Sequence, residues 1–260
     1  MESWGASERT IKARVTMARG RLNDWGLGGF TQENVQTFLA RPRRMADGTE
    51  RPMSQWTRST YHTHIAEFCA WLVATDRLVE SPMPDVRKPK RPTGIPRPLT
   101  ERDVERVMSV AVGRTRTWIM LALYAGLRAS EVAKIRGEDV AADGIYVLGK
   151  GNKPEVLPCH DALWAIAQGY PREGYWFPGS DDGHVPGQQV SLIVGRMFHG
   201  MGIDGSIHRA RHTYGTRLLR EGVNIRTVQK LMRHANLNTT ANYTAVDEHE
   251  LRAAINRLSA

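Results

Sequence analysis

Residues 206–246 read SIHRARHTYGTRLLREGVNIRTVQKLMRHANLNTTANYTAV. The stretch predicts three short helices, each beginning with a Ser or Asn that can cap it: residues 206–220, 224–234 and 238–243. His208 and Arg211 lie three residues apart at the start of the first helix, so their side chains share a face. A helix N-terminus attracts anions, so this pair predicts a phosphate site with a proton-transfer group. The alternative is a basic helix face that only contacts solvent.

A second motif, GLRASE, occupies residues 126–131. Gly126 ends a predicted apolar helix over residues 116–124, and a new helix is predicted to begin near Ser130. Arg128 therefore lies between two helices whose surroundings are otherwise apolar. This position indicates a functional role for Arg128, and the alternative is a structural ion pair with Glu131.

A third motif, GKGNK, fills residues 149–153 between two short predicted strands, residues 144–148 and 155–158. Its glycines and asparagine are typical of a hairpin turn, which can carry Lys150 into a groove. An ordinary exposed turn lysine is the alternative. His234 and Tyr243 lie nine residues apart near the C-terminus. For a tyrosine considered alone, a half-buried packing role is the alternative.

The clearest boundary in the chain is VRKPKRPTGIPRP, residues 86–98. Its four prolines prevent a continuous helix, and it contains basic residues but no acidic ones. We expect an extended linker whose basic side chains contact DNA phosphates, which is compatible with a solvated linker. The predicted DNA contacts are Arg87, Lys88, Lys90 and Arg91. The linker separates residues 1–85 from residues 99–260, in which Thr100 is predicted to begin a helix with Asp103 at the N3 position of a capping box.

The region before the linker has helical periodicity. Predicted helices cover residues 7–25, 31–39 and 59–72, and Thr31 can cap the second of them. Residues 41–55 are predicted to be a loop. Residues 1–97 contain 16 basic and 10 acidic residues, so they contribute +6 of the net charge of +9. A small basic helical domain ahead of a basic linker suggests that this half grips DNA.

The composition excludes several classes of protein. The sequence pI of about 9.9 favours a polyanionic partner. The chain has no apolar run long enough for a transmembrane helix and no secretory signal, so a cytoplasmic protein without membrane contact is expected. Its two cysteines, Cys69 and Cys159, form neither a disulfide framework nor a zinc site. Phosphate-binding GxxxxGK and metalloprotease HExxH motifs are also absent.

Taken in order, GLRASE, GKGNK, HRARHT and the run from Gly222 to Thr244 resemble the tyrosine recombinase (phage integrase) family. The resemblance covers about residues 99–246 in detail. It implies catalytic roles for six residues that match the family motifs: Arg128, Lys150, His208, Arg211, His234 and Tyr243. It implies no metal and no cofactor. There are departures, because Arg233 stands where the family usually has glycine, Ala210 replaces a common leucine and Ala245 a common histidine.

Physical chemistry fits these implied roles. Two guanidiniums can neutralise a pentacovalent phosphorane without a metal. A phenol with an ordinary pKa of about 10 needs a neighbouring base, for which His208 is the candidate, before Tyr243 can attack phosphorus. Lys150 can protonate the leaving 5′-oxygen. The phosphotyrosine conserves the bond energy, so no ATP is needed.

The resemblance implies a mainly α, two-domain DNA clamp: an N-terminal helical core-binding domain and a mostly helical catalytic domain with a small antiparallel β-sheet. It implies double-stranded DNA with inverted-repeat core sites as the partner. Four copies would assemble on two sites, with an accessory directionality factor as a further partner. With six residues before the first predicted helix, no arm-binding domain is expected. A last predicted helix, residues 248–258, has an apolar face that suits a neighbouring copy, and the alternative is packing of this helix on its own domain.

Integration or excision of a phage or other mobile element is the expected function. The alternatives are a recombinase that resolves chromosome or plasmid dimers, and a catalytically silent DNA-binding regulator of the same fold. A relaxing topoisomerase with similar chemistry is a further alternative. The complete set of predicted catalytic groups disfavours the silent regulator.

Overall fold

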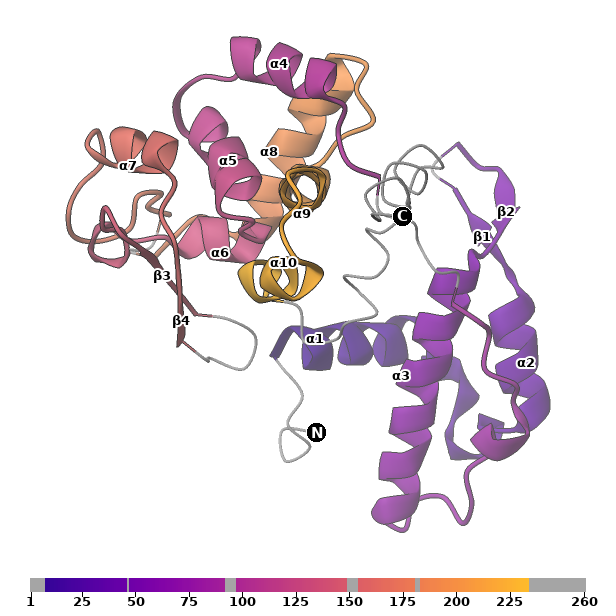
Figure 1. The fold of residues 1–260 in the computed structure, drawn as a ribbon. Helices are drawn as coiled ribbons and strands as arrows, with labels where there is room; N and C mark the ends of the chain where they lie inside the picture. Colours follow the sequence, from indigo (N-terminus) through magenta and orange to yellow (C-terminus); the bar gives the residue numbers. More distant parts are fainter. Residues whose placement is uncertain (1–7, 46, 92–96, 149–153, 181–182, 234–260) are drawn as a thin grey trace, which may run out of the picture. The chain divides into compact units, whose positions relative to one another are not determined.

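The computed structural model describes residues 8–45, 47–91, 97–148, 154–180 and 183–233. The chain divides into two compact units, residues 1–93 and 94–260, each with its own hydrophobic core. Most of the described chain is helical, and its strands form small antiparallel pairs (Figure 1). The predicted mainly α fold with a small antiparallel sheet is therefore confirmed. Among the described helices, none is both long and apolar enough to cross a membrane.

The first unit consists of helices and one small hairpin. Its elements are α1 (Glu8–Met17), α2 (Gln32–Ala40), β1 (Pro42–Arg44), β2 (Glu50–Pro52) and α3 (Gln55–Ala74). A π-helical turn (Ala18–Leu22) and 3-10 turns (Asn23–Trp25, Leu27–Gly29, Met83–Asp85) join or follow them. The core lies between the helices and includes Val35, Phe38, Ile65, Cys69 and Leu72. Burial of these apolar side chains holds the unit together.

Local capping explains where two of these helices begin. Thr31 caps α2 by accepting a hydrogen bond from the backbone N–H of Asn34 at 3.2 Å, as predicted. The helix predicted over residues 59–72 begins earlier, because the Ser54 hydroxyl accepts from the N–H of Thr57 at 3.1 Å. The helix predicted over residues 7–25 is interrupted after Met17 by π-helical and 3-10 turns.

The prediction of a loop over residues 41–55 was wrong, because the chain forms the β1–β2 hairpin there. Arg43 pairs with Arg51 in antiparallel register, and the N–H of Met45 donates to the carbonyl of Thr49 at 2.8 Å. Asp47 accepts from the Thr49 N–H at 2.9 Å and so stabilises the turn. Both strands are three residues long and exposed throughout, so they lack the alternation by which a strand is recognised.

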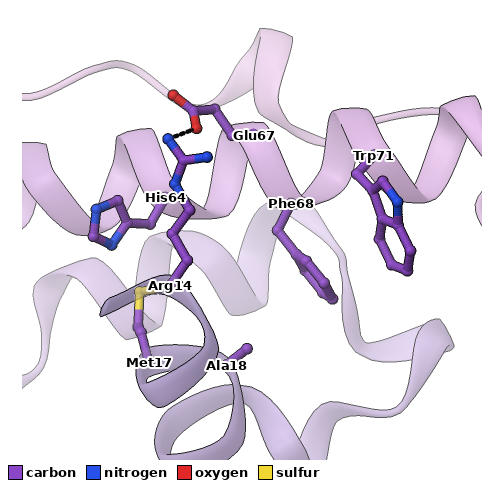
Figure 2. A pocket seen from close by; sticks show the side chains of 7 residues that line it. All are labelled: Arg14, Met17, Ala18, His64, Glu67, Phe68 and Trp71. Atoms are coloured by element: carbon purple, nitrogen blue, oxygen red, sulfur yellow. Dashed lines mark ion pairs between the residues drawn. The ribbon is translucent and has the colours of Figure 1, made fainter. Parts of the chain in front are cut away.

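Helix α1 is joined to α3 by an ion pair between Arg14 and Glu67, with His64 beside them (Figure 2). Burial and then the charge of Arg14 lower the pKa of His64, whereas Glu67 raises it. The cavity between these side chains is about 10 Å³, which is room for a single water molecule. It is therefore a packing gap between two helices and not a ligand site.

The predicted linker begins and ends inside the two units. Val86 is buried in the first core, and its carbonyl bonds Nε2 of His62 at 2.9 Å. The guanidinium of Arg91 donates from Nε to the Ser59 hydroxyl at 3.1 Å. Leu99 is buried in the second core. Arg87, Lys88 and Lys90 are exposed.

The second unit is built around α5, whose residues 117–123 are all buried. Its described elements are α4 (Glu101–Val110), α5 (Gly113–Tyr124), α6 (Ala129–Lys134), β3 (Ile145–Leu148), β4 (Pro154–Leu157), α7 (Asp161–Ala167), α8 (Gly187–Gly200), α9 (Ile207–Arg220) and α10 (Ile225–Met232). Helix α5 packs against α6, α7, α8 and α9, and α10 packs against α9 (Figure 1). The part of α5 from residue 118 to residue 123 is apolar on every face, which explains why it is buried all round.

Strands β3 and β4 pair antiparallel, with Leu148 opposite Pro154. This register agrees with the predicted hairpin, whose turn, residues 149–153, lies outside the described residues. The caps predicted for the surrounding helices are also present. The Thr100 hydroxyl accepts from the N–H of Asp103 at 3.1 Å, and that of Ser206 accepts from the N–H of Arg209 at 3.2 Å.

Helix α9 is tied to the start of the second unit by polar contacts, one buried and one exposed. The N–H of Leu99 donates to the Thr213 hydroxyl at 2.8 Å, in a buried position. Arg209 donates from Nε to the carbonyl of Arg97 at 2.7 Å. These bonds connect residues more than a hundred positions apart, so they anchor the segment that precedes α4 on the helix that carries His208 and Arg211.

Replacing Thr213 by valine should lower the free energy of unfolding by about 1–3 kcal/mol, because it leaves the buried N–H of Leu99 without its acceptor. Urea denaturation measures this change. Thr213→Ser is the matched control, since it keeps the hydroxyl and should retain more of the stability. Equal stability of the valine variant and the wild type would show that this bond contributes nothing.

Candidate active site

A glycine turn places Arg128 at the start of α6. After α5, Gly126 adopts φ +60, and the N–H of Leu127 bonds the carbonyl of Leu121 at 3.3 Å. A Cβ at Gly126 would lie 2.6 Å from Cδ1 of Tyr214, so both the backbone angle and the close approach require glycine. The turn reverses the chain and leaves Arg128 as the N-cap residue of α6.

Arg128 forms an ion pair with Glu131. Its Nη1 donates to Oε1 of Glu131 at 2.7 Å, and its backbone N–H donates to Oε2 at 2.7 Å. The Glu131 side chain is 7% exposed, whereas that of Arg128 is 33% exposed. The structural ion pair that the sequence left open is thus present. Because a third of the arginine side chain stays accessible, the pair does not prevent an anion from reaching it.

Arg211 lies deeper, on α9. Its guanidinium donates to the carbonyls of Gly126 and Met232, and its Nη1 lies 3.8 Å from Oε2 of Glu131. Only 5% of its side chain is exposed. For Arg211 the alternative of a helix face that merely contacts solvent is therefore wrong. The arginine joins the α5–α6 turn to the end of α10.

His208 lies one turn before Arg211 and is exposed. It occupies the first turn of α9, whose N-terminus is capped by Ser206. The structure thus places an accessible imidazole on the helix that also carries the buried guanidinium of Arg211. The remaining predicted catalytic residues, Lys150, His234 and Tyr243, lie outside the described residues.

Arg233 is a member of this cluster that the sequence did not identify as functional. Its Nη2 donates to Oε2 of Glu131 at 2.6 Å and to the carbonyl of Gly126 at 3.3 Å. Its own carbonyl accepts from Nη2 of Arg128 at 3.1 Å. The available signal was an arginine at a position where the resembled family usually has glycine.

Three guanidiniums therefore surround one carboxylate, that of Glu131. With the carboxylate included, the formal charge of the cluster is +2, which suits an anionic ligand. Burial lowers the pKa of Arg233, and the neighbouring charge of Glu131 opposes that shift. A buried carboxylate compensates part of the cost of desolvating cations, but one charge cannot neutralise three.

His212 follows Arg211 and lies partly buried on α9. Burial, followed by the positive neighbours His208, Arg211 and Arg209, lowers its pKa from 6.5 to about 4. The imidazole is therefore neutral at physiological pH. Its neutrality limits the repulsion within a helix turn that already carries two arginines.

This chain is similar to known proteins of one family. The profile of the phage integrase family matches residues 97–250. A tyrosine recombinase of Thermosipho africanus is 30% identical over 266 residues, which cover 97% of this chain and 94% of that protein.

Solved structures are similar as well. The integrase from mycobacterium phage Brujita is 36% identical with a TM-score of 0.54, over 99% of this chain and 88% of that one. The integrase of transposon Tn1549, solved in complex with a circular intermediate DNA, has a TM-score of 0.70 at 19% identity. That match covers 98% of this chain and 95% of the other. At this identity the second likeness concerns the fold alone.

The neutral state of His212 predicts a pH-dependent stability. Its contribution should be complete above pH 6.5 and be lost as the pH falls towards 4, because the unfolded imidazole binds a proton that the folded one rejects. His212→Gln should flatten the decline of the free energy of unfolding between pH 7.5 and 4.5, as measured in urea. His199→Gln, at an exposed position on α8, is the control and should keep it. Parallel curves for His212→Gln and wild type would contradict the assignment.

Proposed function

Because this chain belongs to the phage integrase family of tyrosine recombinases, which are site-specific recombination enzymes, we propose that it cuts and rejoins double-stranded DNA through Tyr243. The observation that carries this proposal is the convergence of Arg128 and Arg211 on Glu131. Two guanidiniums from different helices lie close together at a site that keeps net positive charge. A phosphoryl group whose charge increases in the transition state is the ligand that such a site favours.

In the proposed reaction, the phenol oxygen of Tyr243 forms a bond to phosphorus while the bond from phosphorus to the 5′-oxygen breaks. His208 accepts the phenol proton, and Lys150 donates a proton to the leaving 5′-oxygen. The product is a 3′-phosphotyrosine and a free 5′-hydroxyl. Attack by the 5′-hydroxyl of a second strand reverses these steps and joins the new strands. His234 is proposed as a further member of the site.

Throughout cleavage, Arg128 and Arg211 stabilise the charge on the nonbridging phosphate oxygens. A guanidinium remains protonated and can bond two oxygens at once, which a lysine ammonium cannot do in the same planar geometry. The carbonyl contacts of Arg211 limit its movement, so its orientation is established before DNA binds. Preorganisation of this kind lowers the barrier because few dipoles must reorient during the reaction.

Integration and excision of a phage or other mobile element is the role that we propose for this activity. Its support is the 36% identity to a phage integrase over 99% of the chain. We further propose inverted-repeat core sites, four copies on two DNA sites, and an accessory directionality factor. Sequencing the junctions between the element and its host chromosome would define the core site. A target at a chromosome or plasmid dimer-resolution site would contradict the integrase role.

The N-terminal region is proposed to grip DNA, and the linker is proposed to bind the DNA backbone without base recognition. In this division, residues 1–85 form the core-binding domain, residues 86–98 the linker and residues 99–260 the catalytic domain. The exposure of Arg87, Lys88 and Lys90 supports phosphate contacts. Arg91 has a second function, since its guanidinium lies 4.9 Å from the ring of Trp56 and bonds Ser59.

The arginine cluster and the linker differ in their electrostatic environment. In the second unit, positive charge is gathered around Glu131 in a largely buried cluster, where a low dielectric strengthens its action on a reacting phosphate. In the linker, Arg87, Lys88 and Lys90 are exposed, where salt screens them and their action is less specific. The first kind of charge suits stabilisation of a transition state, and the second suits affinity for a DNA backbone.

Replacing Arg87, Lys88 and Lys90 together by glutamine should weaken binding to every DNA sequence. The slope of log affinity against log salt should flatten by about 0.9 for each phosphate that the protein no longer neutralises. Fluorescence anisotropy at several salt concentrations measures both effects on core-site and scrambled duplexes. Arg196→Gln, a charge change at an exposed position on α8, is the control. A changed base preference with an unchanged slope would overturn the phosphate role.

Tyr243→Phe should abolish covalent attachment to DNA and leave DNA binding intact, because it removes only the nucleophilic hydroxyl. The assay uses a nicked duplex of the core site. The short cleaved fragment diffuses away with its 5′-hydroxyl, so the strand cannot be rejoined and the protein stays covalently attached to DNA. Denaturing gels then show the covalent product. Tyr175→Phe, the same change at a half-buried tyrosine, should trap as wild type does. Undiminished product from Tyr243→Phe would overturn the assignment of the nucleophile.

A further inference from the structure

We propose that Arg233 is a positioning residue of this active site, which shares Glu131 with Arg128 and so keeps the positive charge of Arg128 available to the scissile phosphate. The inference rests on the proposed function, because it assigns a role within the same reaction. Its basis is the backbone of Arg233, the contacts of its side chain and the charge balance of the cluster.

The backbone of Arg233 adopts an unusual conformation. It ends α10 with φ 51 and ψ 47, in the left-handed region that glycine occupies more easily. Among the described residues, the one other non-glycine residue with positive φ is Asp76. A side chain at such a position introduces strain, which contacts elsewhere must offset. Glycine would satisfy the helix end at less cost, so the arginine side chain requires another explanation.

The side chain supplies that explanation, because it is directed into the protein. It is 2% exposed, and its Nη2 contacts Glu131 and the carbonyl of Gly126. Its Nε and Nη1 are buried, with no hydrogen-bond partner among the described residues. Burying a guanidinium that is only partly satisfied is costly, so simple helix capping does not account for it.

Arg233 acts on Arg128 through two routes. Its carbonyl accepts from Nη2 of Arg128 at 3.1 Å. Its guanidinium holds Oε2 of Glu131, while Oε1 of the same carboxylate accepts from Nη1 of Arg128. The orientation of the Arg128 guanidinium is therefore determined from both of its terminal nitrogens. Neither route requires Arg233 to touch DNA.

The charge balance gives the arrangement a consequence for catalysis. Arg211 lies 3.8 Å from Glu131, farther than Arg128 and Arg233 do, so without Arg233 the carboxylate would pair chiefly with Arg128 and offset the charge that is proposed to stabilise the phosphate. Arg233 competes for that carboxylate, so the positive potential at Arg128 is retained. A phosphodiester gains negative charge as it becomes a phosphorane, so loss of this potential should slow cleavage more than it weakens binding.

The experiment compares wild type, Arg233→Met, Arg233→Lys and Arg233→Gly in single-turnover cleavage of the nicked core-site duplex. At saturating DNA, Arg233→Met should cleave about 10- to 100-fold more slowly. The Kd for DNA should stay within about twofold, since a buried side chain releases no DNA counterions. Arg233→Lys should recover part of the rate. Arg136→Met, at an exposed arginine paired with Glu138, is the matched control and should cleave at the wild-type rate.

A substrate of altered charge separates positioning from a merely structural role. In a methylphosphonate, a methyl group replaces one nonbridging oxygen at the scissile position and removes its negative charge. If Arg233 maintains potential for that charge, the penalty of Arg233→Met should shrink to about threefold or less on this substrate. An equal penalty on both substrates would overturn the proposal.

Arg233→Gly controls for folding, because glycine relieves the backbone strain while removing the side chain. It should be as slow as Arg233→Met, while a thermal melt of the same variant should show cooperative unfolding near the wild-type temperature. A folded glycine variant that cleaves at the wild-type rate overturns the positioning role alone. Absence of any covalent complex with wild-type protein overturns the proposed function, and this inference with it.

Discussion

The carboxylate of Glu131 is the group on which the arrangement of the candidate site depends. It lies at the first turn of α6, almost fully buried, and contacts arginines from three separate segments: Arg128, Arg211 and Arg233. Buried guanidiniums repel one another and lose hydration, so they remain close only where an anion compensates them. Without this carboxylate, α6, α9 and α10 would bring cationic side chains together with no anion to offset their mutual repulsion.

Backbone carbonyls supply further hydrogen-bond acceptors for the three arginines. Those of Gly126, Met232 and Arg233 accept hydrogen bonds from the arginines. Each belongs to a chain reversal at a helix end, where carbonyls have no partner within the helix. The ends of α5 and α10 thus supply acceptors that a continuous helix would already have used. The left-handed residues Gly126 and Arg233 are part of the same geometry, because they turn the chain away where these acceptors are needed.

Local signals in the sequence determined the helical class, the caps at Thr31, Thr100 and Ser206, and the order of the motifs from which catalytic residues were predicted. Each depends on residues within a few positions of one another, so it can be recognised without the fold. The exposed β1–β2 hairpin lacked such a signal, and no element was predicted for residues 159–205, where α7 and α8 lie.

Only the tertiary structure decided the environment of the arginines. Glu131 and Arg233 are 102 positions apart, and neither sequence neighbourhood indicates the other. The sequence left open whether Arg128 has a structural or a functional role, and packing shows its ion pair together with an accessible part of its side chain. Packing of α9 and α10 against the α5–α6 turn brings these charges together, because burial of apolar faces, and not local propensity, determines which helix ends meet.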